Sequence, residues 1–344
     1  MTGGHGLRVL AVTNMYPTPK DPTFGSFVAS QMASIADTGA EVDVCFINGR
    51  RGAWAYLAAP LGVRRRARPD RVDVVHAHYG LTGFVASFQP LPLVVSFCGD
   101  DLLGTPDGRG GRTPKSRVIR RLSLAAAQGA DGIICKSDEL RDQLPRRADR
   151  ARARVIPNGV DTSRFSPGDR LAARGRLGLA PEAKLVLFPH TRREARRKRF
   201  DLAEAALGEL GRQGSAGELW VVNGVAPRDM PDHYRAADCV LLTSDHEGSP
   251  NVIKEALCCD LPVVSVDAGD VRRWLALAPG CAVVARDPGA IAAGLRTVLA
   301  TAPRVDGSRV RAEVALAETA EQVIGVYEEA MGRHRSAGRA GAAR

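Results

Sequence analysis

The chain has 344 residues, which is long enough for two domains with full hydrophobic cores. Its hydrophobic content of 44% and charged content of 25% are ordinary for a soluble globular protein, and no apolar run is long enough to span a bilayer. A net charge of +10 fits nucleic acid, an anionic membrane or phosphorylated substrates as partners, but an aromatic content of 5% weakens the case for nucleic acid.

The seven cysteines are scattered and show no metal-ligand spacing. Most lie in apolar segments, which is typical of reduced core residues in a cytosolic protein. Residues 1–6 are Gly-rich and lack the apolar core of a signal peptide. We therefore expect a cytoplasmic location.

The chain begins with an apolar segment at 8–13 that predicts a buried strand. A Pro-rich loop and a helix at about 27–38 follow. Gly25 stands just before this helix, where a glycine lets a ligand approach the backbone closely, although a plain turn would explain it too. The next strand is expected at 41–47.

The segment at 51–68 joins aromatic and aliphatic residues to a cluster of arginines. Such a segment can dock on an anionic membrane. A helix packed on the core, with a solvated basic end, is the plainer interpretation. Both interpretations remain open at this stage.

Two later strands run into polar loops. The strand at 72–78 carries His76 and His78 on one face. A metal site would need a third ligand, and none with useful spacing is evident. The strand at 93–97 is followed by Cys98 and two acidic residues.

Residues 155–165 are rich in turn-forming residues and indicate a domain boundary. A helix at 169–177 and a strand at 184–188 open the second domain. A basic run at 190–199 then precedes a helix that begins near Phe200. Arginines and a lysine beside a helix N-terminus suit a diphosphate, although such runs are more often simply solvated.

The most informative stretch predicts a strand–helix–strand unit, and hence a parallel sheet with a right-handed crossover. Its strands are expected at 239–242 and 262–266. Between them, Ser249 fits an N-cap and Pro250 fits the first helical position.

Two glutamates frame this helix start. Glu247 lies in the loop before it, and Glu255 lies inside the helix and leans back toward that loop. The N–H groups between them form a site for anions and hydroxyls. Two acceptors and a row of donors suit a nucleotide sugar, whereas a capped helix with two solvated acids is the plainer alternative.

The stretch from Ser244 to Ala256 resembles the E-x7-E signature of retaining glycosyltransferases of family 4, with Glu247 and Glu255 as its two glutamates. The resemblance covers nearly all of residues 7–331 and is closest to members of polysaccharide biosynthesis. It implies an α/β GT-B fold, in which two Rossmann-like domains face each other across a cleft. The implied boundaries are an acceptor domain at 1–157, a donor domain at 158–314, a crossover helix at 315–332 that packs on the first domain, and a disordered basic tail at 333–344.

The same resemblance implies roles for individual residues. The family places an Arg and a Lys five residues apart in the basic loop, and Arg193 and Lys198 have that spacing, with Arg192 and Arg197 as neighbours that could be confused with them. The implied catalytic residues are Glu247, Arg193 and Lys198. The implied donor-binding residues are Glu255, Gly248, Ser249, Pro250, Asn251, Val252 and Gly25, and the acceptor-side candidates are His78, Asp100 and Cys98.

Three positions depart from the family pattern. Cys98 stands where many members have a His near the reacting sugar, which puts that role in doubt. Arg199 replaces the usual Gly after Lys198. Asp260 replaces a Gly after the helix, and we expect a local stability cost there.

The resemblance implies a retaining, metal-independent glycosyltransferase that needs no cofactor. Its donor would be a nucleotide diphosphate sugar, and its acceptor a glycan, a lipid-linked sugar or a small molecule in bacterial cell-surface polysaccharide or glycolipid synthesis. Tailoring of a secondary metabolite is the main alternative. Less favoured are a nucleotide-sugar epimerase or phosphorylase of the same fold and a non-catalytic binding protein. We expect no nucleic acid partner and keep contact with the inner face of the membrane as a hypothesis.

Overall fold

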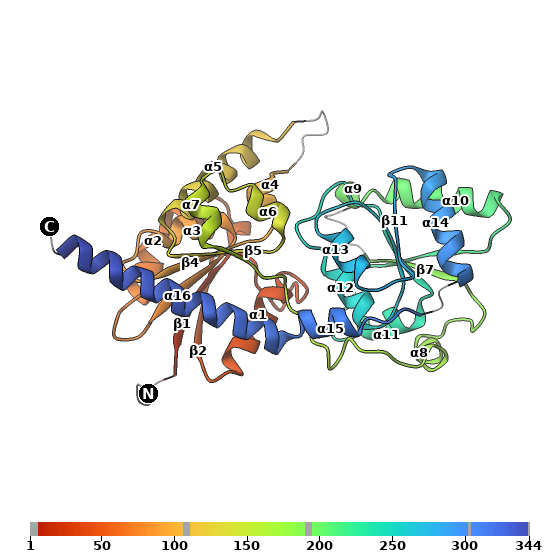
Figure 1. The fold of residues 1–344 in the computed structure, drawn as a ribbon, viewed down its shortest axis with the longest axis horizontal. Helices are drawn as coiled ribbons and strands as arrows, with labels where there is room; N and C mark the ends of the chain where they lie inside the picture. The colour runs from red at the N-terminus through yellow and green to blue at the C-terminus, as the bar shows by residue number, and fades with distance from the viewer. Residues whose placement is uncertain (1–5, 106–110, 190–194, 302–303, 343–344) are drawn as a thin grey trace. The chain divides into compact units, whose positions relative to one another are not determined.

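The computed structural model describes residues 6–105, 111–189, 195–301 and 304–342, with the backbone alone described at 195–196 and 339–342. The chain divides into two compact units, Met1–Gly159 with Leu316–Arg344, and Val160–Ala315 (Figure 1). Each unit is a parallel sheet covered by helices, which confirms the predicted α/β class with two Rossmann-like domains. None of the described helices is long and apolar enough to cross a bilayer.

The first unit is built on a six-stranded parallel sheet of described residues in the order β2-β1-β3-β4-β5-β6. The order reverses between β1 and β3, so the carboxyl ends of these strands form a switch point where open α/β sheets bind ligands. The strands are β1 (Arg8–Thr13), β2 (Glu41–Phe46), β3 (Val74–His78), β4 (Leu93–Phe97), β5 (Gly132–Cys135) and β6 (Ala153–Val155).

Helices cover both faces of this sheet. Successive residues of a strand point to opposite faces, so Leu10 and Val12 of β1 belong to one core and Val9 and Ala11 to the other. The helices are α1 (Ser26–Ala36), η1 (Gly49–Arg51), α2 (Trp54–Arg66), α3 (Gly80–Ala86), α4 (Asp100–Leu103), α5 (Pro114–Gly129), α6 (Asp138–Asp142), α7 (Arg147–Arg152) and α16 (Leu316–Ala342).

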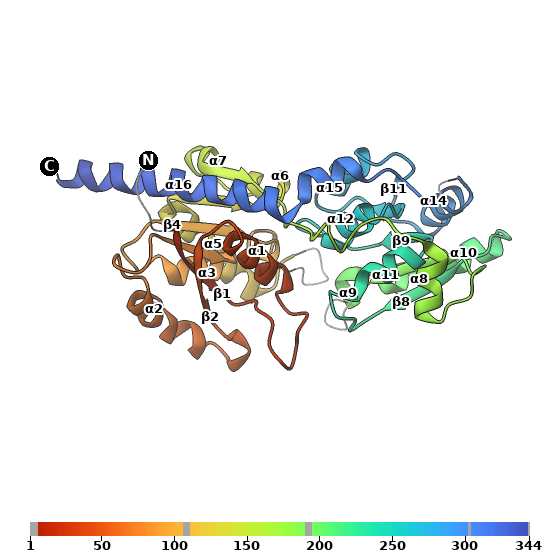
Figure 2. The same cartoon turned by 90° about the horizontal axis from the view of Figure 1, so that it is seen from below.

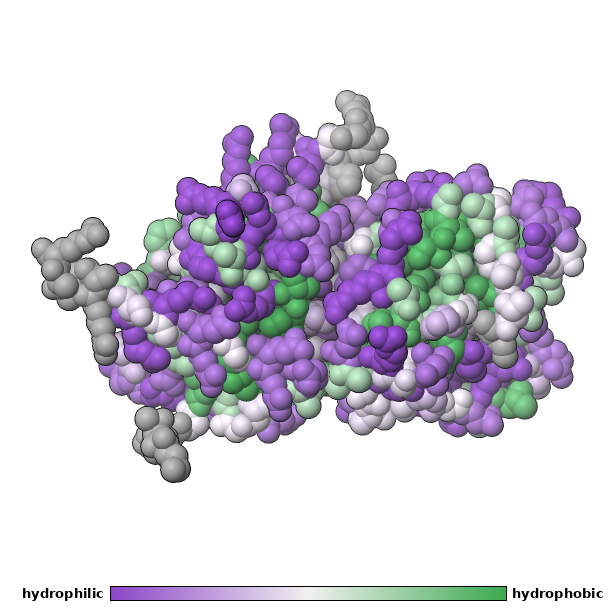
Figure 3. Space-filling view, in the orientation of Figure 1, coloured by the Kyte–Doolittle hydropathy of each residue, from purple (hydrophilic) through white to green (hydrophobic). Residues whose placement is uncertain are grey.

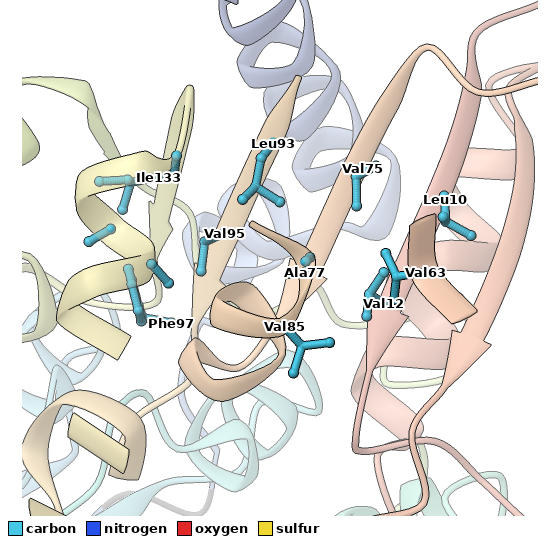
Figure 4. Packing of buried hydrophobic residues seen from close by; sticks show 14 of the residues in the cluster. Leu10, Val12, Val63, Val75, Ala77, Val85, Leu93, Val95, Phe97 and Ile133 are labelled. Carbon is cyan, nitrogen blue, oxygen red and sulfur yellow. The ribbon is translucent and has the colours of Figure 1, made fainter. Parts of the chain in front are cut away.

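The two cores belong to different helices. Figure 4 shows Val63 of α2 and Val85 of α3 against the strand residues of the first core. The second core joins Ile35 of α1 and Tyr327 of α16 to the opposite face. Figure 2 shows α2 and α16 on opposite sides of the sheet accordingly. The last helix of the chain therefore completes the first unit.

The disordered tail expected at 333–344 is wrong within the described residues, because α16 continues to Ala342. Arg333 donates from Nε to the carbonyl of Asp131 at 2.8 Å, and His334 Nδ1 lies 3.1 Å from Asp131 Oδ2. These contacts hold one more turn of α16 against the start of β5. Beyond them, alanine and arginine have high helix propensity, which outweighs the cost of the glycines.

The second unit is built on a parallel sheet in the order β11-β10-β9-β7-β8 among the described residues. Its strands are β7 (Leu185–Pro189), β8 (Glu218–Val222), β9 (Cys239–Leu242), β10 (Val263–Val266) and β11 (Ala282–Val284). The strands are short and almost wholly apolar, as expected of a sheet buried on both faces. The order reverses between β7 and β9, so their carboxyl ends form the switch point of this unit.

The helices of the second unit also pack on both sheet faces, and two separate cores result. They are α8 (Arg170–Leu177), α9 (Ala195–Lys198), α10 (Phe200–Arg212), α11 (Met230–Ala236), α12 (Asn251–Cys258), α13 (Val271–Ala276), α14 (Pro288–Thr301) and α15 (Ser308–Val314). The predicted strand–helix–strand unit is therefore present as β9, α12 and β10.

Candidate active site

The two loops at the switch point of the second unit bring a carboxylate and two cations together. Glu247, in the loop after β9, is only 8% exposed. Lys198 Nζ donates to its Oε1 at 2.8 Å, and Arg197 Nη1 lies 2.5 Å from its Oε2. Ser244 also donates to Oε1, at 2.7 Å. Each oxygen of the carboxylate is thus paired with a basic side chain.

This arrangement fixes the protonation state of Glu247. Burial alone would raise the pKa of its carboxyl group, because a charge is costly in a poorly solvated place. Lys198 and Arg197 outweigh burial and lower the pKa to about 2. Glu247 is therefore an ionised hydrogen-bond acceptor at neutral pH.

The backbone between α9 and α10 explains how Lys198 reaches this position. Arg199 adopts a left-handed conformation with φ 52°, so the chain turns sharply between the two helices. Thr243, at the end of β9, donates to the carbonyls of Lys198 and Arg199 at 2.6 and 3.0 Å. Salt bridges to Asp201 and Asp245 hold the Arg199 side chain.

Two predicted partners of the diphosphate have different outcomes. Lys198 lies at the switch point and its amine contacts Glu247, and its role at the diphosphate stays a prediction. Arg193 and its neighbour Arg192 lie outside the described residues, so the role of Arg193 stays a prediction. Among the described residues, Arg197, which the sequence offered only as a neighbour of Arg193, forms an ion pair with Glu247.

Glu255 has a partner that the sequence did not suggest. Tyr234 of α11 donates to its Oε2 at 2.7 Å. Burial raises the pKa of Glu255, in contrast to Glu247. The two glutamates of one motif therefore differ in chemistry, since one is paired with cations and the other with a neutral phenol.

The start of α12 differs from the prediction. The N-cap is Pro250 and the helix begins at Asn251, so the predictions of Ser249 as N-cap and of Pro250 as the first helical position are both wrong. Ser249 Oγ donates instead to Asp270 Oδ2 at 2.7 Å and accepts from Lys254 Nζ at 3.0 Å. A hydroxyl that caps a helix accepts a hydrogen bond from a backbone N–H, whereas the Ser249 hydroxyl donates to a buried carboxylate, which is the stronger kind of hydrogen bond.

Asp270 belongs to the same corner of the second unit. Trp274 donates from Nε1 to its Oδ2 at 2.7 Å, while Oδ1 is buried without a hydrogen-bond partner in the described residues. Gly269, just before it, has φ 62°, and a Cβ there would lie 2.8 Å from the carbonyl oxygen of Glu247. The loop after β10 is therefore packed directly against the Glu247 loop.

The acceptor-side candidates belong to the first unit. His78 ends β3 and is fully buried, with neither ring nitrogen in a hydrogen bond among the described residues. Cys98 follows β4, and burial raises the pKa of its thiol to about 12. Asp100 is exposed. His78 is therefore fully buried, Cys98 is partly buried and Asp100 is exposed.

The buried member of the acidic pair is Asp101. Its carboxylate accepts from the N–H groups of Gly80, Cys98 and Gly99 at 2.8–3.1 Å. Burial raises its pKa to about 6 against the opposing effect of these donors. Asp101 thus ties the loops after β3 and β4 together.

The backbone conformation at position 25 and its close packing both require a glycine. It has φ 71°, and a Cβ there would lie 2.3 Å from the carbonyl carbon of Met15. The close neighbour in the described structure is thus the chain's own backbone. A ligand contact at Gly25 stays a prediction.

Similarity to known proteins agrees with this geometry. Residues 4–164 match the family described as Glycosyltransferase Family 4, and residues 188–301 match Glycosyl transferases group 1. A D-inositol 3-phosphate glycosyltransferase of Mycolicibacterium gilvum is 30% identical over 319 residues, which cover 82% of this chain and 72% of the relative. The chain belongs to glycosyltransferase family 4. The Geodermatophilus obscurus relative of the same name is 33% identical over 287 residues, 72% of this chain, and the chain spans 63% of that relative's length.

Solved structures show the fold of this family 4 chain. Sucrose-phosphate synthase from Thermosynechococcus elongatus superposes with a TM-score of 0.75 at 18% identity, covering 94% of this chain and 98% of that one. Anabaena Alr3699/HepE in complex with UDP and glucose gives 0.70 at 17% identity, with 94% and 99% covered. These neighbours confirm the GT-B fold.

The candidate site centres on the family 4 signature, but the sequence did not show which side chains contact it. Arg197 was expected only as a neighbour of Arg193, and Tyr234 was not expected at the site. Tyr234, Asp270 and Arg197 act on the signature through contacts between different strands and helices. The only advance signal was position, since Asp270 follows a strand whose carboxyl end lies at the same sheet edge. No residue spacing could have shown their side-chain contacts.

Proposed function

We propose that this family 4 protein is a retaining glycosyltransferase that moves a sugar from a nucleotide diphosphate sugar to an acceptor hydroxyl without a metal ion. The observation that carries the proposal is the Glu247 carboxylate held by Lys198 and Arg197 at the switch point of the second unit. Glu255 and the start of α12 complete the donor side. Structural neighbours in complex with UDP and with UDP-glucose support uracil, as UDP, as the first donor base to test.

The proposed chemistry is electrostatic. When the bond between sugar and diphosphate breaks, negative charge grows on the departing phosphate, and Lys198 and Arg197 exceed the charge of Glu247 by one unit. Cations fixed in a poorly solvated site stabilise such charge strongly.

Glu247 would accept hydrogen bonds from sugar hydroxyls. A carboxylate with a pKa of about 2 is too weak a base to remove the acceptor proton. We therefore assign that proton to an oxygen of the departing phosphate, with attack on the same face of the sugar.

The acceptor has three candidate classes. Relatives named D-inositol 3-phosphate glycosyltransferase support a phosphorylated polyol. A growing cell-surface polysaccharide or glycolipid is the class that the sequence predicts, and a secondary metabolite is the third. The acceptor class can be screened once the donor is known.

The proposal includes a peripheral contact with anionic membrane through α2. Trp54, Leu57 and Leu61 share one face of this helix and are 79%, 70% and 57% exposed. The opposite face packs on the core through residues such as Val63. Exposed arginines at 64–66 follow the apolar face, which suits anionic lipid headgroups.

The test of the function is nucleoside diphosphate release from a panel of UDP-, GDP-, dTDP- and ADP-sugars, with and without EDTA. We expect release from one donor, unaffected by EDTA. Release that EDTA abolishes would refute metal independence. No release from any donor, together with no thermal shift with any nucleotide, would refute the proposed function itself.

A further inference from the structure

His76 and His78 lie on the same face of β3, but among the described residues only His76 has hydrogen-bond partners for its ring nitrogens. His76 is fully satisfied, because its Nδ1 lies 2.7 Å from the hydroxyl of Tyr327 and its Nε2 lies 2.7 Å from Ser96 Oγ. His78 packs on the His76 ring with centroids 4.1 Å apart, yet neither of its nitrogens has a hydrogen-bond partner among the described residues. His76 is a structural residue, and His78 has unused hydrogen-bonding capacity at the carboxyl end of the strand.

Lys136 adds an unused cation at the same sheet edge. It follows β5 directly and is 1% exposed, and within the described residues its Nζ has no hydrogen-bond or ion-pair partner. The register pairs His78 with Ser96 and Ser96 with Ile134. Lys136, two residues after Ile134, continues on the same face by strand alternation.

Asp101, the carboxylate that acts electrostatically on Lys136, already accepts hydrogen bonds from the backbone. Its oxygens accept three backbone N–H groups. The other two groups that act on Lys136, Cys98 and Cys135, are neutral thiols at physiological pH because burial raises the pKa of each. Lys136 therefore has no direct counterion in the described part of the chain.

A buried lysine without a partner is costly to keep. Burial lowers the pKa of Lys136, because desolvation disfavours its charged form. A methionine of similar length would fill the same space without that cost. An anionic ligand that binds beside the amine would offset this desolvation cost.

We propose that Lys136 and His78 form a binding site for an oxyanion, a phosphate or carboxylate, at the carboxyl ends of β3 and β5 in the first unit. The lysine supplies the charge and the imidazole supplies a hydrogen bond, beside the loop that Asp101 fixes. A further contributor is α1, which begins at this edge without an acidic residue in its first turn. That the oxyanion belongs to the acceptor rests on the proposed function, whereas the anion site itself does not.

The test measures binding of inorganic phosphate to the full chain by calorimetry. The key variant is Lys136→Met, and Lys115→Met, on the exposed side of α5, is its matched control. Lys198→Met removes the cation of the second unit and shows which binding belongs there. We expect Lys136→Met to weaken, by about tenfold or more, a phosphate site that Lys115→Met and Lys198→Met leave in place.

Thermal unfolding separates a binding lysine from a structural one. Because the amine is buried and unpaired, Lys136→Met should keep or raise the Tm. Unchanged phosphate binding in Lys136→Met would overturn the proposal. A lowered Tm with a proportional loss of every bound ligand would assign Lys136 a structural role and overturn it as well.

Two further ligands identify the source of the anion. myo-Inositol 3-phosphate should bind wild type more tightly than inorganic phosphate does, and Lys136→Met should remove that difference while weak binding of myo-inositol persists. Equal affinity for both phosphates would overturn the assignment to the acceptor. Donor turnover is a separate readout: without it the proposed function fails, but a Lys136-dependent phosphate site still stands.

Discussion

The Glu247 carboxylate is paired with two basic side chains, Lys198 and Arg197. Each is mostly buried, so removing one leaves the others with uncompensated charge. The sequence predicts Glu247 and Lys198 as site residues but not their contact, because the two are 49 residues apart and meet only where β7 and β9 pair. The motif therefore identifies a residue as part of the site, whereas the order of the strands in the sheet determines which side chain it contacts.

The pKa of Glu247 gives a pH-dependent prediction. Its folded-state pKa of about 2 lies below the ordinary value, so the stabilisation it provides is present above about pH 4.3 and is lost as the pH falls toward 2. A shift of this size corresponds to roughly 3 kcal/mol. Glu247→Gln should therefore unfold more easily than wild type at pH 7, and the difference should shrink below pH 4. Denaturant unfolding at several pH values measures both, and a pH-independent difference would contradict the assignment.

Lys198→Ala should lower kcat for sugar transfer by about 10²–10³, because a fixed cation beside the departing phosphate is lost. Lys198→Arg keeps the charge and should recover part of the rate. Lys184→Ala, an exposed lysine of the same unit, serves as the control and should retain wild-type kcat. Nucleoside diphosphate release under donor saturation is the measurement. Activity of Lys198→Ala near wild type would remove Lys198 from the mechanism.

The acidic pair after β4 shows where prediction from single residues stops. Asp100 and Asp101 follow Gly99 and are chemically equivalent in the sequence. Only Asp101 turns inward, where three N–H groups converge on its carboxylate. Those donors come from loops after two different strands, so no local pattern could distinguish the two aspartates.

At the ends of the helices, two turns in which the family has glycine show how a side chain can replace it. Arg199 and Asp260 both adopt a left-handed backbone, with φ 52° and 56°. The family glycine is explained by this conformation, which costs other residues about 1–2 kcal/mol. The stability cost predicted for Asp260 is offset, since its Oδ1 accepts from the N–H of Gly307 at 2.9 Å and pairs with Arg311 at 2.5 Å.

Substitutions at Asp260 separate backbone strain from side-chain contact. Asp260→Ala keeps the strained φ and loses both contacts with α15 and the residue before it, so we expect a loss of about 2 kcal/mol in the free energy of unfolding. Asp260→Gly loses the same contacts but relieves the strain, so it should lose about 1 kcal/mol less. Urea unfolding of both variants gives the comparison. An alanine variant as stable as the glycine variant would show that the left-handed turn carries no cost.

At the scale of the whole molecule, the alternating strands and helices were sufficient to predict two parallel-sheet units. Apolar strands buried on both faces, separated by amphipathic helices, have few other stable arrangements. The extent of α16 was harder to predict, because Arg- and Ala-rich residues at 333–342 form a helix only where a preceding helix is already anchored. The net charge of +10 is also a property of the whole chain, and Figure 3 shows hydrophilic side chains along α5, where Lys115 and Arg121 are exposed.

Charge alone does not distinguish a membrane surface from a soluble anionic substrate, but charge beside exposed apolar residues does. If α2 docks on membrane, the chain should sediment with phosphatidylglycerol vesicles at low ionic strength and dissociate as salt rises.

Neutralising Arg64 and Arg65 should weaken binding by about 2 kcal/mol, roughly 30-fold, at about 1 kcal/mol per charge. Trp54→Ser with Leu57→Ser should weaken binding at every salt concentration, because apolar burial is not screened. Leu171→Ser, an exposed leucine of the second unit, is the matched control and should change nothing. Absence of vesicle binding at low salt would exclude the membrane contact, and binding that depends on charge but not on Trp54 and Leu57 would show electrostatic adsorption in place of insertion.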